Sequence, residues 1–99
     1  MATYGKRQVD VIIDVRSRLE YLFGHIQGAR CIPLHRLESK IARLDGIGTK
    51  SSILLYCASG TRSKLAADLL HRLGYTRVID GGPLQRMRIE ARPGGKLLL

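Results

Sequence analysis

Short blocks of apolar residues, separated by polar turns, run along most of the chain and predict alternating strands and helices. The blocks at residues 9–15 and 53–56 are rich in β-branched and aliphatic side chains, as expected for buried strands. The segments 30–32 and 75–80 predict two further strands. Strands that alternate with helical segments indicate an α/β fold.

Helical periodicity fills the segments between these strands. Apolar residues recur at helical spacing over 35–44 and 64–73, which predicts two amphipathic helices. The second of them is expected to bury one face, which comprises Leu65, Ala66, Leu69, Leu70 and Leu73. Ser17 and Glu20 form a capping-box pattern for a short helix that ends near Phe23, and Gly74 is placed to end the helix at 64–73.

The two ends of the chain lack this patterning. Residues 1–8 are polar and are expected to form a loose lead-in. The glycine pair at 81–82 predicts a turn, and a short last helix is expected over 83–90. Residues 91–99 contain a Pro-Gly-Gly sequence and are expected to form a flexible tail, whose final three leucines are too few to anchor in a membrane.

The segment with the clearest chemistry joins the strand at 53–56 to the helix at 64–73. It places Cys57 at the carboxyl end of a strand and near a helix N-terminus, where parallel α/β sheets bind their ligands. Backbone N–H groups, the helix dipole and the Arg62 side chain would all favour a negatively charged sulfur there. The sequence therefore predicts a reactive thiolate at neutral pH.

The loop from Cys57 to Ser63 resembles the active-site loop of the rhodanese-like sulfurtransferases, in which Cys-x-x-x-x-Arg precedes a small hydroxyl residue. The resemblance continues downstream in Gly-Tyr-x-x-Val at 74–78 and in the glycine pair at 81–82. Upstream, the matching residues are Asp14, Val15, Arg16, Glu20, Tyr21, Gly24, His25, Ile26, Gly28, Ala29, Ile32 and Pro33. Relatives often carry a tryptophan after the paired glycines, and Met87 or Ile89 is expected to fill its place here.

This resemblance implies an α/β fold with a central, mainly parallel sheet of about five short strands and helices on both faces. It also implies the domain organisation of the chain. Residues 1–8 would form the polar lead-in, 9–90 the rhodanese-like domain and 91–99 the flexible tail. Asp14 and Arg16 are expected to support the architecture through ion pairing rather than to take part in chemistry.

The resemblance further implies that Cys57 is the catalytic nucleophile of a sulfurtransferase of the thiosulfate (rhodanese) type. The residues expected to bind substrate are Ala58, Ser59, Gly60, Thr61, Arg62 and Ser63. Cys57 would take a sulfane sulfur from a small anionic donor such as thiosulfate, or from a persulfide, and pass it to cyanide, a thiol or a protein acceptor. No metal or organic cofactor is expected, because the Cys57 persulfide itself carries the sulfur. The position of Ala58 often holds a cationic or polar side chain in thiosulfate-using relatives, so the donor stays open.

Composition restricts the partners and the compartment. The chain has 99 residues and a formal net charge of +9, from 17 Lys and Arg against 8 Asp and Glu. It has no run of five basic residues and no aromatic-interleaved RNA motif, which favours a solvated basic surface over specific nucleic-acid binding. No apolar run approaches the roughly 20 residues that cross a bilayer, and the polar N-terminus lacks a signal-peptide core. A cytoplasmic protein with no membrane partner is expected.

Several residues have less specific interpretations. Cys31 lies among strand-like residues and is interpreted as a small core residue, with a role as resolving cysteine as the alternative. His25 is expected to bond to the backbone, with general-base catalysis as the alternative. His35 and His71 have no partner ligands at useful spacing, so no metal site is expected.

Two other functions compete with sulfur transfer. One is a non-catalytic module that keeps the rhodanese fold and docks a sulfur-relay or signalling partner. The retention of both Cys57 and Arg62 argues against it, since a purely structural module has no need of the nucleophile. The other is phosphatase or arsenate reductase chemistry. It is disfavoured because phosphatase loops are one residue longer and because no aspartic acid stands beside the loop as a general acid.

Overall fold

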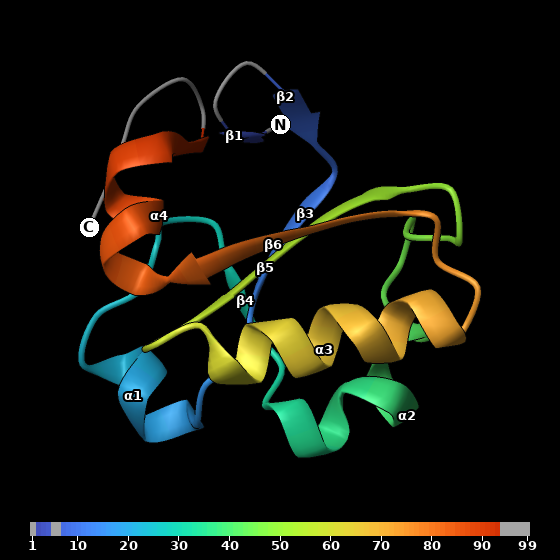
Figure 1. Cartoon of the computed structure of the whole chain (residues 1–99), viewed down its shortest axis with the longest axis horizontal. Coiled ribbons are helices and arrows are strands. Elements are labelled where there is room, and N and C mark those ends of the chain that lie inside the picture. The colour runs from blue at the N-terminus through green and yellow to red at the C-terminus, as the bar shows by residue number, and fades with distance from the viewer. Residues whose placement is uncertain (1, 5–6, 94–99) are drawn as a thin grey trace.

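The computed structural model describes residues 2–4 and 7–93 and has a four-stranded parallel sheet at its centre (Figure 1). In spatial order the strands are β4 (Arg30–Cys31), β3 (Val11–Asp14), β5 (Ser52–Cys57) and β6 (Arg77–Pro83). All six residues of β5 are buried, because this strand has a neighbour on each side and helices or loops over both faces. The predicted α/β class is confirmed, with four strands in the parallel sheet where about five were expected.

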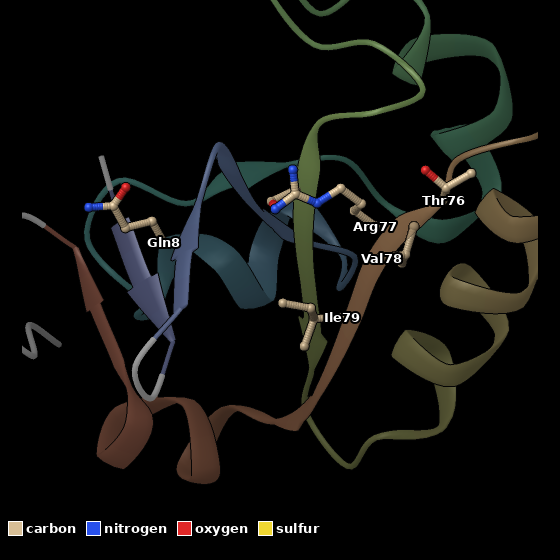
Figure 2. Close-up of a pocket in the computed structure, with 6 residues that line it drawn as sticks. Gln8, Thr76, Arg77, Val78 and Ile79 are labelled. Atoms are coloured by element: carbon tan, nitrogen blue, oxygen red, sulfur yellow. The ribbon is translucent and has the colours of Figure 1, made fainter.

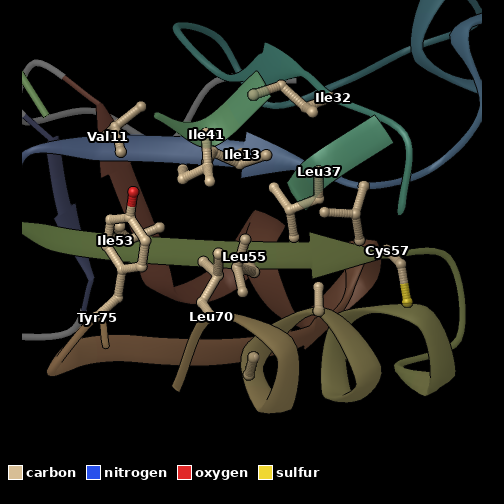
Figure 3. Close-up of a cluster of buried hydrophobic side chains, with 13 residues drawn as sticks. Val11, Ile13, Ile32, Leu37, Ile41, Ile53, Leu55, Cys57, Leu70 and Tyr75 are labelled. Atoms are coloured by element: carbon tan, nitrogen blue, oxygen red, sulfur yellow. The ribbon is translucent and has the colours of Figure 1, made fainter. Parts of the chain in front are cut away.

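Helices cover both faces of this sheet. α2 (Leu37–Ile41) and α3 (Thr61–Arg72) pack on one face, where Ile53 and Leu55 of β5 contribute to the larger hydrophobic cluster (Figure 3). α4 (Leu84–Glu90) covers the other face, where Leu54 contributes to a second cluster. Side chains of β5 alternate between the two clusters because successive residues of a strand point to opposite faces.

Cys57 belongs to the α2–α3 side of the sheet. It is the last residue of β5, and Figure 3 shows its sulfur facing the first turn of α3. Tyr56, one position earlier, points to the opposite cluster. The alternation of the strand therefore decides which helix meets the thiol.

A second, antiparallel sheet lies at the ends of the chain. It consists of β1 (Ala2–Tyr4), β2 (Arg7–Val9) and β7 (Ala91–Pro93), in the order β2-β1-β7. The sequence did not predict it, because the lead-in is polar and because β1 pairs with β7, almost ninety positions away. Residues 94–99, which include the end of the expected tail and its three leucines, lie outside the described residues.

Two predicted helices differ in extent from the observed ones. The segment 35–44 forms a 3-10 turn, η1 (Leu34–Arg36), followed by α2, which ends at Ile41. α3 begins three residues before the expected start, at Thr61. The short helix after Ser17 is confirmed as α1 (Arg18–Leu22), with the complete capping box.

The face that α3 buries agrees only in part with the predicted one. Leu65 and Leu73 were expected to be covered but are 53% and 38% exposed. Ala66 and Leu70 are buried as predicted, together with Ser63 and Ala67. Close approach of α3 to the sheet requires small side chains, so alanines and a serine occupy the contact and Leu65 is turned outward.

The paired glycines lie in β6 rather than in a separate turn. Gly81 is buried, and a Cβ added there would lie 2.6 Å from Sδ of Met87 and 2.9 Å from the carbonyl oxygen of Leu55. The absence of a side chain at Gly81 thus lets α4 approach β5 closely. Met87, one of the two residues expected to take the place of the family's tryptophan, is fully buried at this contact.

Candidate active site

The sulfur of Cys57 accepts two main-chain hydrogen bonds. The N–H of Gly60 donates to Sγ over 3.0 Å and the N–H of Ser63 over 3.3 Å. Both donors belong to the start of α3, whose N-terminal dipole is positive. Such an arrangement stabilises a sulfur anion without a charged side chain, as a loop that holds a thiolate or a persulfide anion must do.

Gly60 gives the loop its shape. It is the N-cap residue of α3 and has φ +100°, a left-handed conformation that favours glycine. The hydroxyl of Ser63 donates to the carbonyl oxygen of Gly60 over 3.1 Å. The glycine geometry and the serine contact together aim two N–H groups at one atom.

Arg62 is anchored to α1. Its two terminal nitrogens donate to the two carboxylate oxygens of Glu20 over 2.6 and 3.0 Å. The hydrogen bonds that the Glu20 carboxylate accepts from Arg62 and from the N–H of Ser17 together lower its pKa to about 2. The hydrogen bond with Glu20 also raises the pKa of Arg62 above its usual value. Arg62 thus connects the loop to α1, while a contact of Arg62 with a sulfur donor stays a prediction.

The other predicted loop residues lie at the surface. Ala58, Ser59 and Thr61 are exposed, so they form the rim of the site rather than its floor. A shallow hollow beside them is lined by Ser59, Gly60, Thr61, Lys64, Leu65, Asp68, Asp80 and Gly82. Cys57 itself is fully covered and does not line this hollow.

Asp14 and Arg16 form a buried ion pair beneath the loop. Arg16 Nη2 lies 2.7 Å from Asp14 Oδ2 and also donates to the carbonyl oxygen of Gly24 over 2.7 Å. The Arg16 guanidinium lies over the ring of Tyr56, whose hydroxyl accepts the N–H of Ile26. The expected architectural role of Asp14 and Arg16 agrees with these contacts.

His25 and Cys31 have local partners. Nδ1 of His25 is 2.8 Å from the carbonyl oxygen of Tyr21, and its ring stacks on the Tyr21 ring at 3.6 Å. Cys31 is half-buried rather than part of the core, because its side chain lines a surface hollow with Lys40 and Arg43. Burial raises the pKa of the Cys31 thiol, which opposes the reactivity expected of a resolving cysteine.

Sequence reasoning did not find the partnership of Glu20 with Arg62. The capping box identified Glu20 through its local contact with Ser17, and that contact is present. Its second partner lies 42 residues away, so no local pattern could reveal it. The spacing of Glu20 from Asp14 within the family signature was the only available signal.

A second hollow, of about 640 Å³, lies at the opposite end of the sheet (Figure 2). Figure 2 places Gln8 of β2 on one side and Thr76 to Ile79 on the other. Its lining has the hydroxyls of Ser52 and Thr76 but no cysteine, and it lies at the end of β5 away from Cys57. Within the described ranges, no cluster of three or more His, Cys, Asp or Glu residues is arranged to hold a metal ion. None of the helices there is both long and apolar enough to cross a membrane.

A family model for the rhodanese-like domain matches residues 2–83, which is most of the chain. The chain belongs to the rhodanese-like domain family. The resemblance inferred from the Cys57 loop is thus confirmed. The Cys57 loop lies at the carboxyl end of β5, and its role as the active site of this rhodanese-like domain stays a prediction.

Known proteins similar to this rhodanese-like domain come from bacteria and from eukaryotes. The uncharacterized protein YqhL of Bacillus subtilis is 42% identical over 79 residues, which are 80% of this chain and 58% of YqhL. Thiosulfate sulfurtransferase PspE of Escherichia coli is 36% identical over 74 residues, 74% of this chain and 69% of PspE. The solved structure of a rhodanese with anions from Escherichia coli has a TM-score of 0.75 at 32% identity, and the match covers 82% of this chain and 94% of that one. The domain thus spans little more than half of YqhL.

Proposed function

We propose that this domain is a sulfurtransferase that carries sulfur as a persulfide on Cys57. The observation that supports this most directly is the pair of N–H groups, from Gly60 and Ser63, that point at Sγ at the start of α3. A buried cysteine with a structural role has no need of such donors. The name of PspE, a thiosulfate sulfurtransferase, supports the same chemistry.

The proposed reaction has two steps. The Cys57 thiolate attacks the outer sulfur of thiosulfate, a new sulfur–sulfur bond forms at Sγ, and sulfite leaves with the electron pair of the bond that breaks. An acceptor nucleophile then attacks the outer sulfur of the Cys57 persulfide, and the Cys57 thiolate is released with its electron pair. The transfer is thereby divided into two easier displacements, and no metal or organic cofactor is required.

The loop residues have separate proposed tasks. The N–H groups of Gly60 and Ser63 stabilise the negative charge that is on Sγ before attack and on the outer sulfur afterwards. Arg62, held by Glu20, keeps the loop against α1 and adds positive potential for an anionic donor. Ala58, Ser59 and Thr61 form the exposed rim over which donor and acceptor approach.

The nature of the donor is the open part of the proposal. Ala58 offers no charge to thiosulfate, so a persulfide donor is the alternative within the same mechanism. A thiol that must stay reduced between turnovers fits a reducing compartment such as the cytoplasm. Both cysteines are free in this structure, in keeping with that proposal.

Intact-protein mass spectrometry after incubation with thiosulfate tests the proposal. The wild-type chain should gain the mass of one sulfur, cyanide should remove it, and a Cys57→Ser variant should gain nothing. A Cys31→Ser variant is the matched control and should load like the wild type. Loading only from a persulfide would change the donor and keep the mechanism. If no donor loads Cys57, sulfur transfer is wrong and the non-catalytic docking module takes its place.

A further inference from the structure

The apolar side chains of α1 face solvent, which is the reverse of an ordinary surface helix. None of the α1 residues is buried, and Leu19, Leu22 and the C-cap residue Phe23 are 65%, 68% and 86% exposed. Spacings of three and four residues place these side chains on one side of the helix. Single exposed leucines are common, whereas a group of neighbouring ones indicates an interaction site. We name Leu19, Leu22 and Phe23 the α1 patch.

Polar contacts, not apolar ones, hold α1 on the domain. Glu20 bonds to Arg62 with both carboxylate oxygens, and the Tyr21 hydroxyl donates to the carbonyl oxygen of Ala29 over 2.6 Å. Ser17 caps the helix through the backbone N–H of Glu20. These contacts hold Glu20 and Tyr21 against the domain and fix the orientation in which the α1 patch is displayed.

The α1 patch lies beside the Cys57 loop. Arg62 belongs to that loop and Glu20 to α1, and Figure 1 shows α1 next to the segment between β5 and α3. On the α3 side of the loop, Leu65 is 53% exposed and lines the hollow that includes Ser59. Exposed apolar side chains thus stand on both sides of the route to the sulfur.

The charge of the domain indicates what covers these side chains. The chain has a net charge of +9, and Arg18 of α1 and Lys64 of α3 are exposed. The charge of Glu20 is offset by Arg62, so Arg18 determines the sign of the charge on α1. Asp68 and Asp80 line the hollow on the α3 side. The binding partner that complements α1 best has an apolar surface for the α1 patch and carboxylates around it.

We propose that the α1 patch and Arg18 dock an acidic protein that presents its own cysteine thiol to the Cys57 persulfide. This inference rests on the sulfur transfer proposed above and names its acceptor. The acceptor thiolate attacks the outer sulfur, the bond between that sulfur and Sγ breaks, and the Cys57 thiolate leaves with the electron pair. The acceptor becomes the persulfide, so atoms and electrons balance without a further reagent.

Other occupants fit the α1 patch less well. Cyanide and thiosulfate have no apolar surface, so a site built for them alone gains nothing from Leu22 or Phe23. A second copy of the chain would bring another strongly positive surface to the same place. A membrane would cover the loop and supply no thiol to receive the sulfur.

Short synthetic peptides with a central cysteine test the proposal. One peptide carries leucines beside the cysteine and aspartates at both ends, and its matched partner carries lysines in place of the aspartates. Persulfidated protein is mixed with each peptide, and loss of the added sulfur is followed by intact mass. We expect faster transfer to the acidic peptide, and a smaller advantage at high salt because screening weakens the attraction.

One double variant and one single variant locate the docking surface. Leu22→Gln together with Phe23→Gln removes most of the α1 patch at exposed positions, so folding is retained. This variant should transfer to the acidic peptide about tenfold more slowly, a loss of about 1.4 kcal/mol in docking. Its transfer to cyanide should be unchanged. Leu73→Gln, an exposed leucine at the other end of α3, is the matched control and should behave like the wild type.

Binding without chemistry separates this inference from the function on which it rests. Fluorescence anisotropy of the labelled acidic peptide, with serine in place of its cysteine, should show weaker binding to the double variant than to the wild type. If Cys57 accepts no sulfur but this difference appears, docking stands and sulfur transfer falls. Equal rates and equal binding for the wild type and the double variant would overturn the docking proposal. Self-association that the wild type shows and the double variant loses would also overturn it. Binding to anionic phosphatidylglycerol vesicles that the wild type shows and the double variant loses would do the same.

Discussion

At the residue scale, main-chain groups control the sulfur of Cys57. The N–H groups of Gly60 and Ser63 reach Sγ because Gly60 has φ +100° and because the Ser63 hydroxyl bonds back to the Gly60 carbonyl. The charged side chain of the loop, Arg62, bonds instead to Glu20. The geometry of the backbone is therefore the property on which the proposed reactivity depends most.

Gly60→Ala is expected to slow sulfur loading of Cys57 and to destabilise the fold. A side chain in the left-handed region costs about 1–2 kcal/mol, and relief of that strain would move the N–H group away from Sγ. Loading with thiosulfate by intact mass and unfolding in urea measure the two effects. Gly46→Ala is the matched control, because Gly46 also has positive φ and nothing within 4 Å of an added Cβ. It should lose stability and load sulfur at the wild-type rate. Equal loading by both variants would contradict the role given to the Gly60 N–H.

At the scale of elements, the loop, α1 and α3 form one unit through the Glu20–Arg62 pair. The pair joins the first turn of α3 to α1, and the capping box joins α1 to Ser17. Both side chains are 35% exposed, so solvent weakens the attraction between them. We therefore expect the pair to contribute more to the positioning of the loop against α1 than to the stability of the fold.

The pair makes a pH-dependent contribution to stability. The pKa of Glu20 is lowered from 4.5 to about 2, so the contribution is complete above pH 4.5 and is lost as the pH falls towards 2. Its size should stay under about 1 kcal/mol because the pair is partly exposed. The melting temperature of the wild type should therefore fall more steeply between pH 4.5 and 2 than that of Glu20→Gln. Glu38→Gln, at an exposed position of α2, is the control and should follow the wild-type profile.

The contact of α3 with the sheet makes another prediction at this scale. Leu70 is fully buried in the larger cluster, whereas Leu65 is 53% exposed. Leu70→Ala should lower the free energy of unfolding by about 3 kcal/mol, because it leaves a cavity. Leu65→Ala should change it by less than about 0.5 kcal/mol. Denaturation in urea measures both, and similar losses would show that the burial of α3 has been misassigned.

At the scale of the whole molecule, the positive charge acts over the whole surface, whereas the exposed apolar side chains of α1 and Leu65 mark one end of the sheet. The net charge of +9 produces a field that attracts anions to any part of the surface. The exposed apolar side chains of α1 and Leu65 then give one location a further preference. The charge would attract small anionic donors to the whole surface. The apolar side chains would hold protein partners beside the Cys57 loop.

Loading from thiosulfate should therefore slow as salt is added. At low ionic strength the positive field extends over about 30 Å, and at 1 M salt over about 3 Å, so the rate constant should fall between these conditions. Loading from an uncharged persulfide donor should change little over the same range. The measurement is the rate of sulfur gain by intact mass at several concentrations of sodium chloride. A thiosulfate rate that is independent of salt would exclude electrostatic steering.

Local pattern was sufficient to predict the parts of the fold that depend on neighbouring residues. The strand at 53–56, the loop with Cys57 and Gly60, the capping box at Ser17 and the helix end at Gly74 all appear in the structure. The loop, the capping box and the helix end depend on interactions between residues a few positions apart. The strand was predicted from its run of apolar residues, although it pairs with the distant strands β3 and β6. The parallel sheet followed from the alternation of such segments.

The sequence by itself determined the order of the elements, the place of Cys57 between a strand and a helix, and the family to which the loop belongs. Tertiary structure alone decided that Arg62 meets Glu20, which is 42 residues away, and that α1 displays the α1 patch. It also decided that Leu65 lies outside while Ala66 and Ala67 lie inside, since close packing of α3 on the sheet selects small residues. The physical reason is common to all three cases. Periodicity records which side chains are apolar, whereas the fit between surfaces decides which of them are covered.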